Sequence, residues 1–172
     1  LLEDWTREIA IQLMGECGLR ASEVSYPTNE KLRWSGPGEC WLLEVRGKNT
    51  KGGNRTIRDA WVPESVAESI HRYASERDFD NEESWIDVST GTVRRWVRDA
   101  AVSVSARMGD ERWSNVSSHD LRRSWATYHL VERGVDVRTM MAIGGWSSYS
   151  AIEPYLDEPT EARIGSVMTR TV

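Results

Sequence analysis

The sequence predicts a mainly helical fold with one small antiparallel β-sheet, which places the chain in the α+β class. Most segments repeat apolar residues at the spacing of an amphipathic helix. Two short apolar segments on either side of a glycine-rich stretch instead have the composition of paired strands. The chain has 172 residues, of which 39% are hydrophobic and 28% charged. Such a composition is globular, and the length suits one domain, residues 1–172, with a substantial core.

Helices are expected where apolar spacing coincides with a capping residue at the start or with a glycine or proline at the end. The expected N-terminal caps are Ser89 or Thr90, Ser118 and Asp136, and Pro154 interrupts the last candidate helix. The expected helices cover residues 5–17, 21–24, 63–74, 93–104, 119–133, 137–143 and 147–156, and part of the tail after residue 159.

The expected sheet is a hairpin. Residues 41–45 and 56–62 are apolar, and the stretch between them, residues 47–54, is rich in glycine and asparagine, as a hairpin loop is. Pro63 ends the second strand. Residues 27–38 and 107–116 are expected to be loops.

The net charge of −5 argues against a nucleic-acid ligand, because DNA-binding proteins usually present a basic face. Of the 22 basic residues, however, only Lys31, Lys48 and Lys51 are lysines. An acidic, lysine-poor and arginine-rich composition is typical of proteins adapted to high salt, a halophile-like character. Net charge does not set the local potential in a cleft, where arginines could still gather.

Other features of the composition exclude several classes of protein. Cys17 and Cys40 are too few for a disulfide framework, and with only three histidines they argue against a metal centre, so we expect neither a metal nor a cofactor. No apolar run approaches the roughly 18 residues of a membrane helix, and the first residues do not resemble a signal peptide. We therefore expect a cytoplasmic protein. The chain begins inside an expected helix, which favours a fragment of a longer protein.

Four segments carry residues that could act on a phosphate. Arg20 follows the helix-breaking Gly18 and is expected at the start of a helix, where backbone N–H groups also bind anions. A lysine in the hairpin loop could act as a general acid. His119 and Arg122, three residues apart, share a helix face and could reach one phosphate. The fourth segment runs from Gly144 to Tyr155. Each segment alone also has a plain interpretation, such as a surface arginine paired with a neighbouring glutamate or a solvated turn lysine.

Together the four segments resemble the tyrosine recombinase (phage integrase) family, whose members act in DNA recombination and in the integration of mobile genetic elements. The resemblance covers nearly the whole chain and depends on the order of the motifs. The matching segments are residues 18–23 (first arginine box), 44–48 followed by 61–63 (hairpin with the catalytic lysine), 119–127 (second box), and Gly145-Trp146 with Tyr155 nine positions later.

This chain departs from the family pattern at three positions. Trp146 stands where the family usually has histidine; it can pack against the nucleophile and donate one N–H, but it cannot exchange protons. Arg123 stands where histidine is frequent. The long hairpin loop leaves Lys48 and Lys51 as candidates for the catalytic lysine, and the position directly after Gly47 favours Lys48. Tyr149 comes too early in the fourth segment, so the nucleophile is assigned to Tyr155.

The resemblance implies the fold of DNA breaking-rejoining enzymes and a reaction without metal or ATP. Tyr155 would attack a DNA phosphate and the 5′ oxygen would leave, so that a 3′-phosphotyrosyl bond conserves the energy for rejoining. Arg20 and Arg122 would hold the non-bridging oxygens, His119 would hold or deprotonate a reacting group, and Lys48 would protonate the leaving oxygen.

The family also implies partners. Glu23 and Asp120 are expected behind the site, where they orient an arginine and a helix. The expected ligand is double-stranded DNA, and the full-length protein is expected to carry an N-terminal DNA-clamping domain and to assemble as a homo-tetramer on paired DNA sites. The fragment alone is expected to be monomeric and weakly active. The DNA target, and the choice between integration, excision, resolution and inversion, remain open.

Three alternative functions compete with a recombinase. A type IB topoisomerase would share the chemistry, but the Gly145-Trp146 box and the short chain favour the recombinase. A catalytically silent DNA-binding or regulatory module of integrase descent is opposed by the complete set of candidate residues. A helical interaction domain without a role on DNA would suit the acidic charge. A structure separates these hypotheses, because the enzyme requires Arg20, His119, Arg122 and Tyr155 around one phosphate-sized site. The segment of Tyr155 is expected to be mobile, so that this residue can be displaced when DNA is absent.

Overall fold

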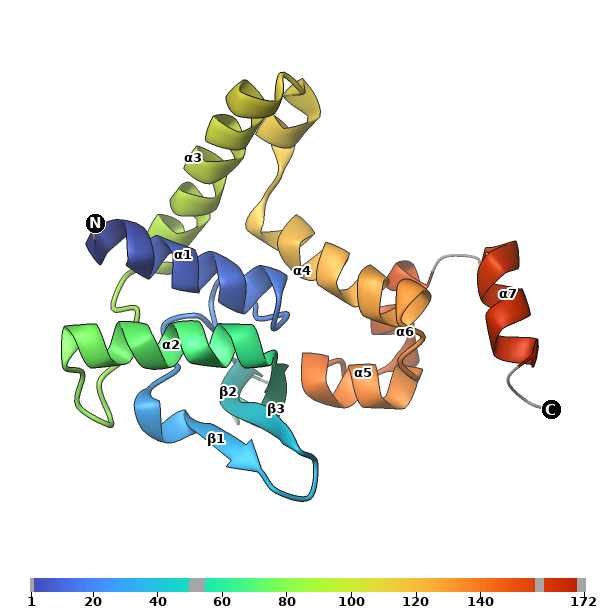
Figure 1. Ribbon diagram of the computed structural model, residues 1–172, viewed down its shortest axis with the longest axis horizontal. Coiled ribbons are helices and arrows are strands. Elements are labelled where there is room, and N and C mark those ends of the chain that lie inside the picture. Colours follow the sequence, from blue (N-terminus) through green and yellow to red (C-terminus); the bar gives the residue numbers. More distant parts are fainter. Residues whose placement is uncertain (1, 50–54, 157–159, 170–172) are drawn as a thin grey trace.

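The protein has the expected α+β class (Figure 1). The structure is a computed structural model, and it describes residues 2–49, 55–156 and 160–169. The helices are α1 (Leu2–Gly15), α2 (Glu64–Arg77), α3 (Thr90–Met108), α4 (Ser118–Thr127), α5 (Val137–Gly144), α6 (Tyr149–Ile152) and α7 (Glu161–Met168), and the strands are β1 (Leu32–Ser35), β2 (Cys40–Asn49) and β3 (Arg55–Val62).

The sheet has three strands, one more than expected. β2 lies in the centre and pairs antiparallel with β1 and with β3. It extends to Asn49, so Lys48 belongs to a strand and not to the hairpin loop. β1 falls in a segment expected to be a loop. It has only four residues, of which only Leu32 is buried, so its alternation of apolar and polar residues is too short to distinguish a strand from a loop.

Two of the helix predictions are wrong in detail. Residues 21–24 form hydrogen-bonded turns instead of a helix, with the Glu23 amide donating to the Arg20 carbonyl at 2.8 Å. Pro27 follows too closely for a helix to propagate. α4 is capped by Ser117 and not by Ser118: the Asp120 amide donates to the Ser117 hydroxyl, and the Ser117 amide donates to the Asp120 carboxylate at 2.9 Å.

The later helices begin near the predicted caps, although α3 is longer than predicted and ends at Met108 instead of residue 104. Ser89 caps α3 and Asp136 caps α5, each by accepting a hydrogen bond from a backbone amide of the first turn. α5 ends at Gly145, which has a left-handed conformation with φ of 70°. α4 continues into a π-helical turn, Tyr128–Glu132, and Gly134 then ends the helix with φ of 62°.

The interior consists of two hydrophobic clusters. The first contains buried residues from α1, the sheet, α2 and the start of α3, and the second contains buried residues from α4 to Tyr155. Figure 1 shows α1 and α2 side by side, with α5 and α6 beyond them and α3 projecting from the body of the domain. The segments that carry the candidate site residues meet where the two clusters adjoin.

Gly18 lies at this junction and is crowded by Trp125 of α4. Its φ is 70°, and a Cβ added to it would lie 2.3 Å from the Trp125 ring. We expect Gly18→Ala to lower the free energy of unfolding by about 2–5 kcal/mol, through left-handed strain of about 1–2 kcal/mol plus overpacking of about 1–3 kcal/mol. Denaturant unfolding measures this change.

Gly109 provides the matched control for this substitution. Its φ is 66°, but a Cβ there would have no neighbour within 4 Å. Gly109→Ala should therefore show the backbone strain alone. Equal losses of stability in the two variants would mean that Trp125 does not require a glycine at position 18.

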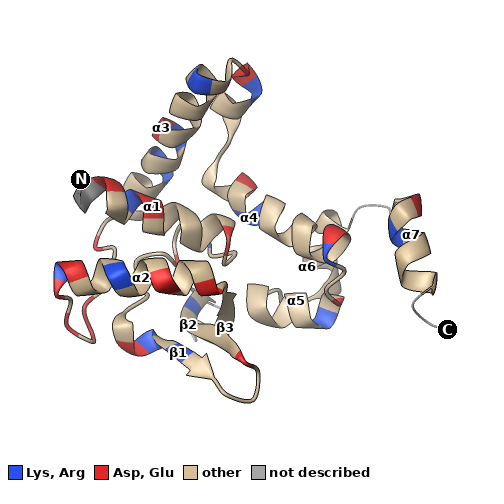
Figure 2. Ribbon diagram, viewed as in Figure 1, with Lys and Arg blue, Asp and Glu red and all other residues tan. Residues whose placement is uncertain are grey.

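Several acidic residues lie away from this junction, although Glu23 lies within it. Figure 2 shows Asp and Glu at the end of α2 and in the loop that follows it. The negative net charge therefore does not describe the junction, where arginines predominate. In the part of the chain that the structure describes, no helix combines the length and apolar character that a bilayer crossing requires.

Candidate active site

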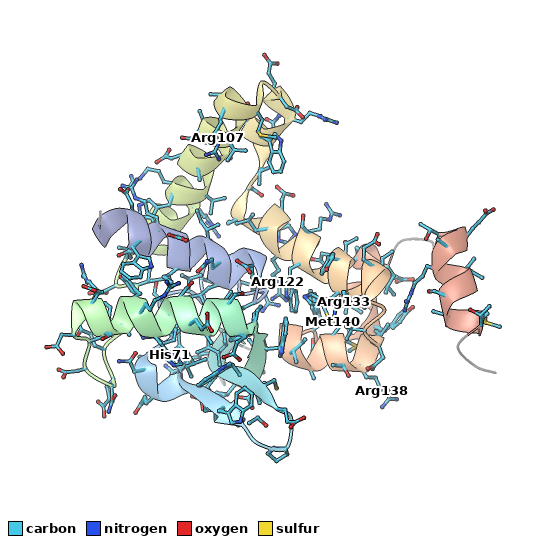
Figure 3. All side chains as sticks on the ribbon, viewed as in Figure 1. His71, Arg107, Arg122, Arg133, Arg138 and Met140 are labelled. Carbon is cyan, nitrogen blue, oxygen red and sulfur yellow. The ribbon has the colours of Figure 1, made fainter. Side chains whose placement is uncertain are left out.

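Arg122 lies at the centre of the molecule (Figure 3) and its residue surface is 2% exposed. One of its terminal nitrogens donates to the Gly18 carbonyl, and the other donates to the Gly144 carbonyl at 2.6 Å. Its guanidinium carbon lies 4.2 Å from the centre of the Trp146 ring, an interaction of cation and aromatic face. Arg122 therefore connects the segment after α1, the end of α5 and the Gly-Trp box.

The positive charge of the Arg122 guanidinium is only partly balanced by the groups around it. Burial, together with the positive charge of Arg20, lowers the pKa of Arg122 to about 9. Among the described residues, its hydrogen bonds go to neutral carbonyls and not to a carboxylate. An anion bound beside Arg122 would favour the charged form and would therefore bind favourably.

Arg20 is held by Glu23, and Glu23 is held by Arg58. The Arg20 side chain donates to one Glu23 carboxylate oxygen at 2.7 Å, and the Arg20 amide donates to the other at 2.8 Å. Arg58, from β3, forms two parallel hydrogen bonds to the same carboxylate, each of 2.9 Å. Glu23 is 2% exposed, so it serves as a buried anchor between two arginines. The family motif predicts a role for Glu23 beside Arg20, whereas Arg58 lies outside the motifs.

Together with Arg122, these two arginines bind three consecutive carbonyls at the end of α5. Arg58 donates to Ile143 at 2.9 Å, Arg122 donates to Gly144, and Arg20 donates to Gly145 at 3.3 Å. The last carbonyls of a helix have no partner within the helix and carry partial negative charge, so arginines stabilise them. The end of α5 thereby fixes the arginines relative to one another.

Glu23 gives the site a dependence on pH. Burial alone would raise its pKa, but the hydrogen bonds and charges of Arg58 and Arg20 outweigh burial and lower the pKa below its ordinary value of 4.5. A carboxylate with a lowered folded-state pKa contributes stability that is present above the unfolded-state pKa and is lost as the pH falls through the folded-state value.

We therefore expect wild-type protein to be more stable than Glu23→Gln at neutral pH, and the difference in melting temperature to shrink below about pH 4.5. Thermal unfolding of both proteins across this range measures the effect. A difference that stays constant down to the acid end would contradict an ionised Glu23.

A cavity of about 320 Å³ opens beside Arg20 and Arg122. His119, on the first turn of α4, also lines it, as does Arg94, near the start of α3, which belongs to none of the sequence motifs. No acidic side chain is among its lining residues, so the cavity presents positive charge and is suited to an anion such as a phosphate group. A second cavity, of about 410 Å³, adjoins the π-helical turn and contains none of the predicted site residues.

Tyr155 does not line the 320 Å³ cavity and packs against Trp146 instead. Its residue surface is 9% exposed, and its ring lies 5.4 Å from that of Trp146, which in turn lies under Arg122. Tyr149 begins α6 and is 56% exposed. The structure thus brings Arg20, His119 and Arg122 to one cavity, with Trp146 and Tyr155 in the adjoining layer.

Two further predicted residues lie elsewhere. Asp120 caps α4 through Ser117, whose hydrogen bonds lower the pKa of the Asp120 carboxyl, so it fixes the helix that carries His119 and Arg122. The backbone of Lys48 is in β2, and its side chain is outside what the structure describes, as is all of Lys51. The choice between the two lysines stays a prediction.

The chain belongs to the phage integrase family, whose model matches residues 3–161. Over 150 residues it is 29% identical to the tyrosine recombinase XerA of Pyrococcus furiosus, an alignment that covers 87% of this chain and 49% of the relative. It is 27% identical to the tyrosine recombinase XerC of Syntrophus aciditrophicus, covering 84% of this chain and 46% of the relative. The chain therefore spans about half the length of these curated relatives.

Solved structures confirm the fold. The chain matches XerA recombinase with a TM-score of 0.66 at 20% identity, covering 96% of this chain and 58% of the other. It matches the XerH recombinase bound to a palindromic difH substrate with a TM-score of 0.69 at 14% identity, covering 98% and 46%. The integrase of the transposon Tn1549, in complex with a circular intermediate DNA, gives 0.67 at 16% identity, covering 96% and 58%. The fold is that of the catalytic part of tyrosine recombinases.

Proposed function

We propose that this chain is the catalytic domain of a site-specific DNA recombinase that cuts and rejoins DNA through a covalent 3′-phosphotyrosyl bond to Tyr155. The observation that carries the proposal is the cavity shared by Arg20, His119 and Arg122, beside the Trp146–Tyr155 pair. Membership of the phage integrase family supports it, as do relatives that are named tyrosine recombinases.

In this reaction the Tyr155 oxygen forms a bond to phosphorus as the bond from phosphorus to the 5′ oxygen breaks. The forked donors of Arg20 and Arg122 stabilise the charge that grows on the non-bridging oxygens. His119 accepts the proton that the Tyr155 hydroxyl loses or holds the phosphate, and Lys48 supplies the proton that the 5′ oxygen takes up. Rejoining reverses these steps on another 5′ end, so the total number of phosphodiester bonds is conserved without ATP.

Tyr155 must move for this chemistry, because it is buried beside Trp146 and does not line the cavity. Catalytic groups in DNA-free proteins are often displaced from their reactive positions. The segment from Ser148 to Leu156 is built from one α-helical and one 3₁₀ turn, which form few local hydrogen bonds and so oppose such a movement weakly.

The partners follow from the same proposal. The ligand is double-stranded DNA, in keeping with the XerH structure bound to a palindromic difH substrate and the Tn1549 integrase structure in complex with a circular intermediate DNA. The protein acts at the DNA of the host cell, in the cytoplasm. The domain works in a longer protein with a DNA-clamping domain, which assembles as a tetramer on two sites.

A suicide substrate tests the proposal. The full-length protein is mixed with duplex DNA that is nicked beside a candidate cleavage site, taken from repeats that flank the gene. The short strand released with the free 5′ hydroxyl diffuses away. Rejoining then cannot occur, and the covalent complex accumulates. We expect a protein–DNA adduct without added metal, with the nucleotide located on Tyr155 by peptide mass spectrometry. If DNA is bound but no adduct forms, the chain is better explained as a silent DNA-binding module than as a recombinase. If the adduct is on Tyr149, the assigned register is wrong.

A further inference from the structure

Arg58 is a buried charged residue that the reaction described above does not use. It lies on β3 in phase with Ala60 and Val62, two residues that are 0% and 1% exposed, so the period of the strand directs it inward. Its side chain is 9% exposed. Burying a guanidinium is costly unless its donors are satisfied in good geometry, which makes its contacts informative.

Three donors of Arg58 are satisfied by two different parts of the site. Two of its nitrogens bind both oxygens of Glu23, and its Nε binds the Ile143 carbonyl. The planar fork of an arginine can make this set of contacts, and the single ammonium of a lysine cannot. The backbone also closes on Arg58, since a Cβ added to Gly145 would lie 2.7 Å from its Cδ.

Both contacts of Arg58 lead to Arg20. The Glu23 carboxylate receives hydrogen bonds from the Arg20 side chain and amide, and the Gly145 carbonyl, two residues after Ile143, receives a third hydrogen bond from Arg20. Arg20 is thus held on one side by Glu23, which Arg58 also binds, and on the other by a carbonyl two residues after the one that Arg58 binds. We propose that Arg58 is a positioning residue that aligns Arg20 for the DNA phosphate, acting through Glu23 and through the carbonyl end of α5.

This inference rests on the proposed recombinase function, and it extends that function to a residue outside the family boxes. Without Arg58, Arg20 would keep its charge but lose the anchor that limits its rotation. Orientation of transition-state donors contributes more to rate than to ground-state affinity. The expected loss is therefore in the rate of cleavage and not in the affinity for DNA.

The test compares full-length wild type, Arg58→Gln and Arg33→Gln in single-turnover adduct formation at saturating DNA. Arg33 is the matched control: it is an arginine on the same sheet, and its partner Asp59 lies 2.7 Å away on the surface. We expect Arg58→Gln to slow adduct formation by about 10–100-fold with DNA affinity within about threefold of wild type. We expect Arg33→Gln to match wild type.

The pH profile separates positioning from simple loss of structure. The charged groups that face Glu23 are Arg20, Arg58 and Arg122, and removing Arg58 takes away the strongest influence that keeps Glu23 ionised despite burial. The acid limb of the rate profile should therefore move to higher pH in Arg58→Gln.

The outcomes distinguish the two proposals. If wild type forms no adduct, the recombinase function fails. If wild type forms one and Arg58→Gln keeps both its rate and its pH profile, only the role of Arg58 is overturned. If Arg58→Gln does not fold, Arg58→Lys takes its place, since it retains the charge. Full recovery of rate and profile by lysine would refute positioning by the fork, and an intermediate rate would support it.

Discussion

Replacing Tyr155 with phenylalanine is expected to abolish the covalent protein–DNA adduct. The hydroxyl oxygen is the atom that would bond to phosphorus, and no other group on this ring can replace it. The ring itself, which packs 5.4 Å from Trp146, is retained, so the melting temperature should stay within about 1–2 °C of wild type. A suicide-substrate assay measures the adduct, and a mobility-shift assay confirms that the DNA is still bound.

Tyr149→Phe is the control for this experiment. Tyr149 is six positions earlier, at the start of α6, and is exposed, so its hydroxyl should not be needed. An adduct that persists in Tyr155→Phe but disappears in Tyr149→Phe would reverse the assignment. An adduct that persists in both variants would place the nucleophile elsewhere.

Replacing Arg122 with alanine is expected to reduce the rate of adduct formation by at least about 100–1000-fold, the loss typical when one preorganised transition-state donor is removed. The effect on stability is a balance. The Gly18 and Gly144 carbonyls lose their partner, which costs about 1–3 kcal/mol for each unsatisfied group. Removing a buried cation whose pKa is lowered to about 9 offsets part of that loss.

Two variants control for charge and for folding. Arg122→Lys keeps a positive charge, but its single ammonium cannot replace the fork that reaches two separate carbonyls, so its rate should also fall sharply. Arg112→Ala removes a side chain that is 91% exposed and pairs with the neighbouring Asp110, and it should leave the rate unchanged. A rate for Arg122→Ala within about tenfold of wild type would remove Arg122 from the proposed mechanism.

The sequence predicted the residues of the site more completely than their geometry. Local motifs identified Arg20, His119 and Arg122, and the structure places all three at one cavity. The position of Tyr155 behind Trp146 could not be predicted, because it depends on how two short turns pack against α4 and α5. The helix expected after Arg20 was wrong because a pattern of four residues does not distinguish a helix from consecutive turns.

Arg58 was missed although the sequence contained a signal for it. In the strand expected at residues 56–62, a period of two places Arg58 on the same face as Ala60 and Val62. A charged residue on the buried face of a strand requires a buried partner, and Glu23 is that partner. Its identity depends on a contact between residues 35 apart, which no local pattern contains.

The hydrogen bonds from arginines to the end of α5 also indicate which residues an inactive descendant of this domain would retain. Arg122, Arg58 and Arg20 hold backbone carbonyls and the buried Glu23, so selection for folding alone would preserve them after activity was lost. Among the described residues, no hydrogen bond holds the Tyr155 hydroxyl. Selection for folding would therefore not prevent its replacement by another residue. Among relatives of this chain, therefore, an intact set of arginines is weak evidence of catalytic activity. The tyrosine is the residue that distinguishes an active enzyme from an inactive descendant.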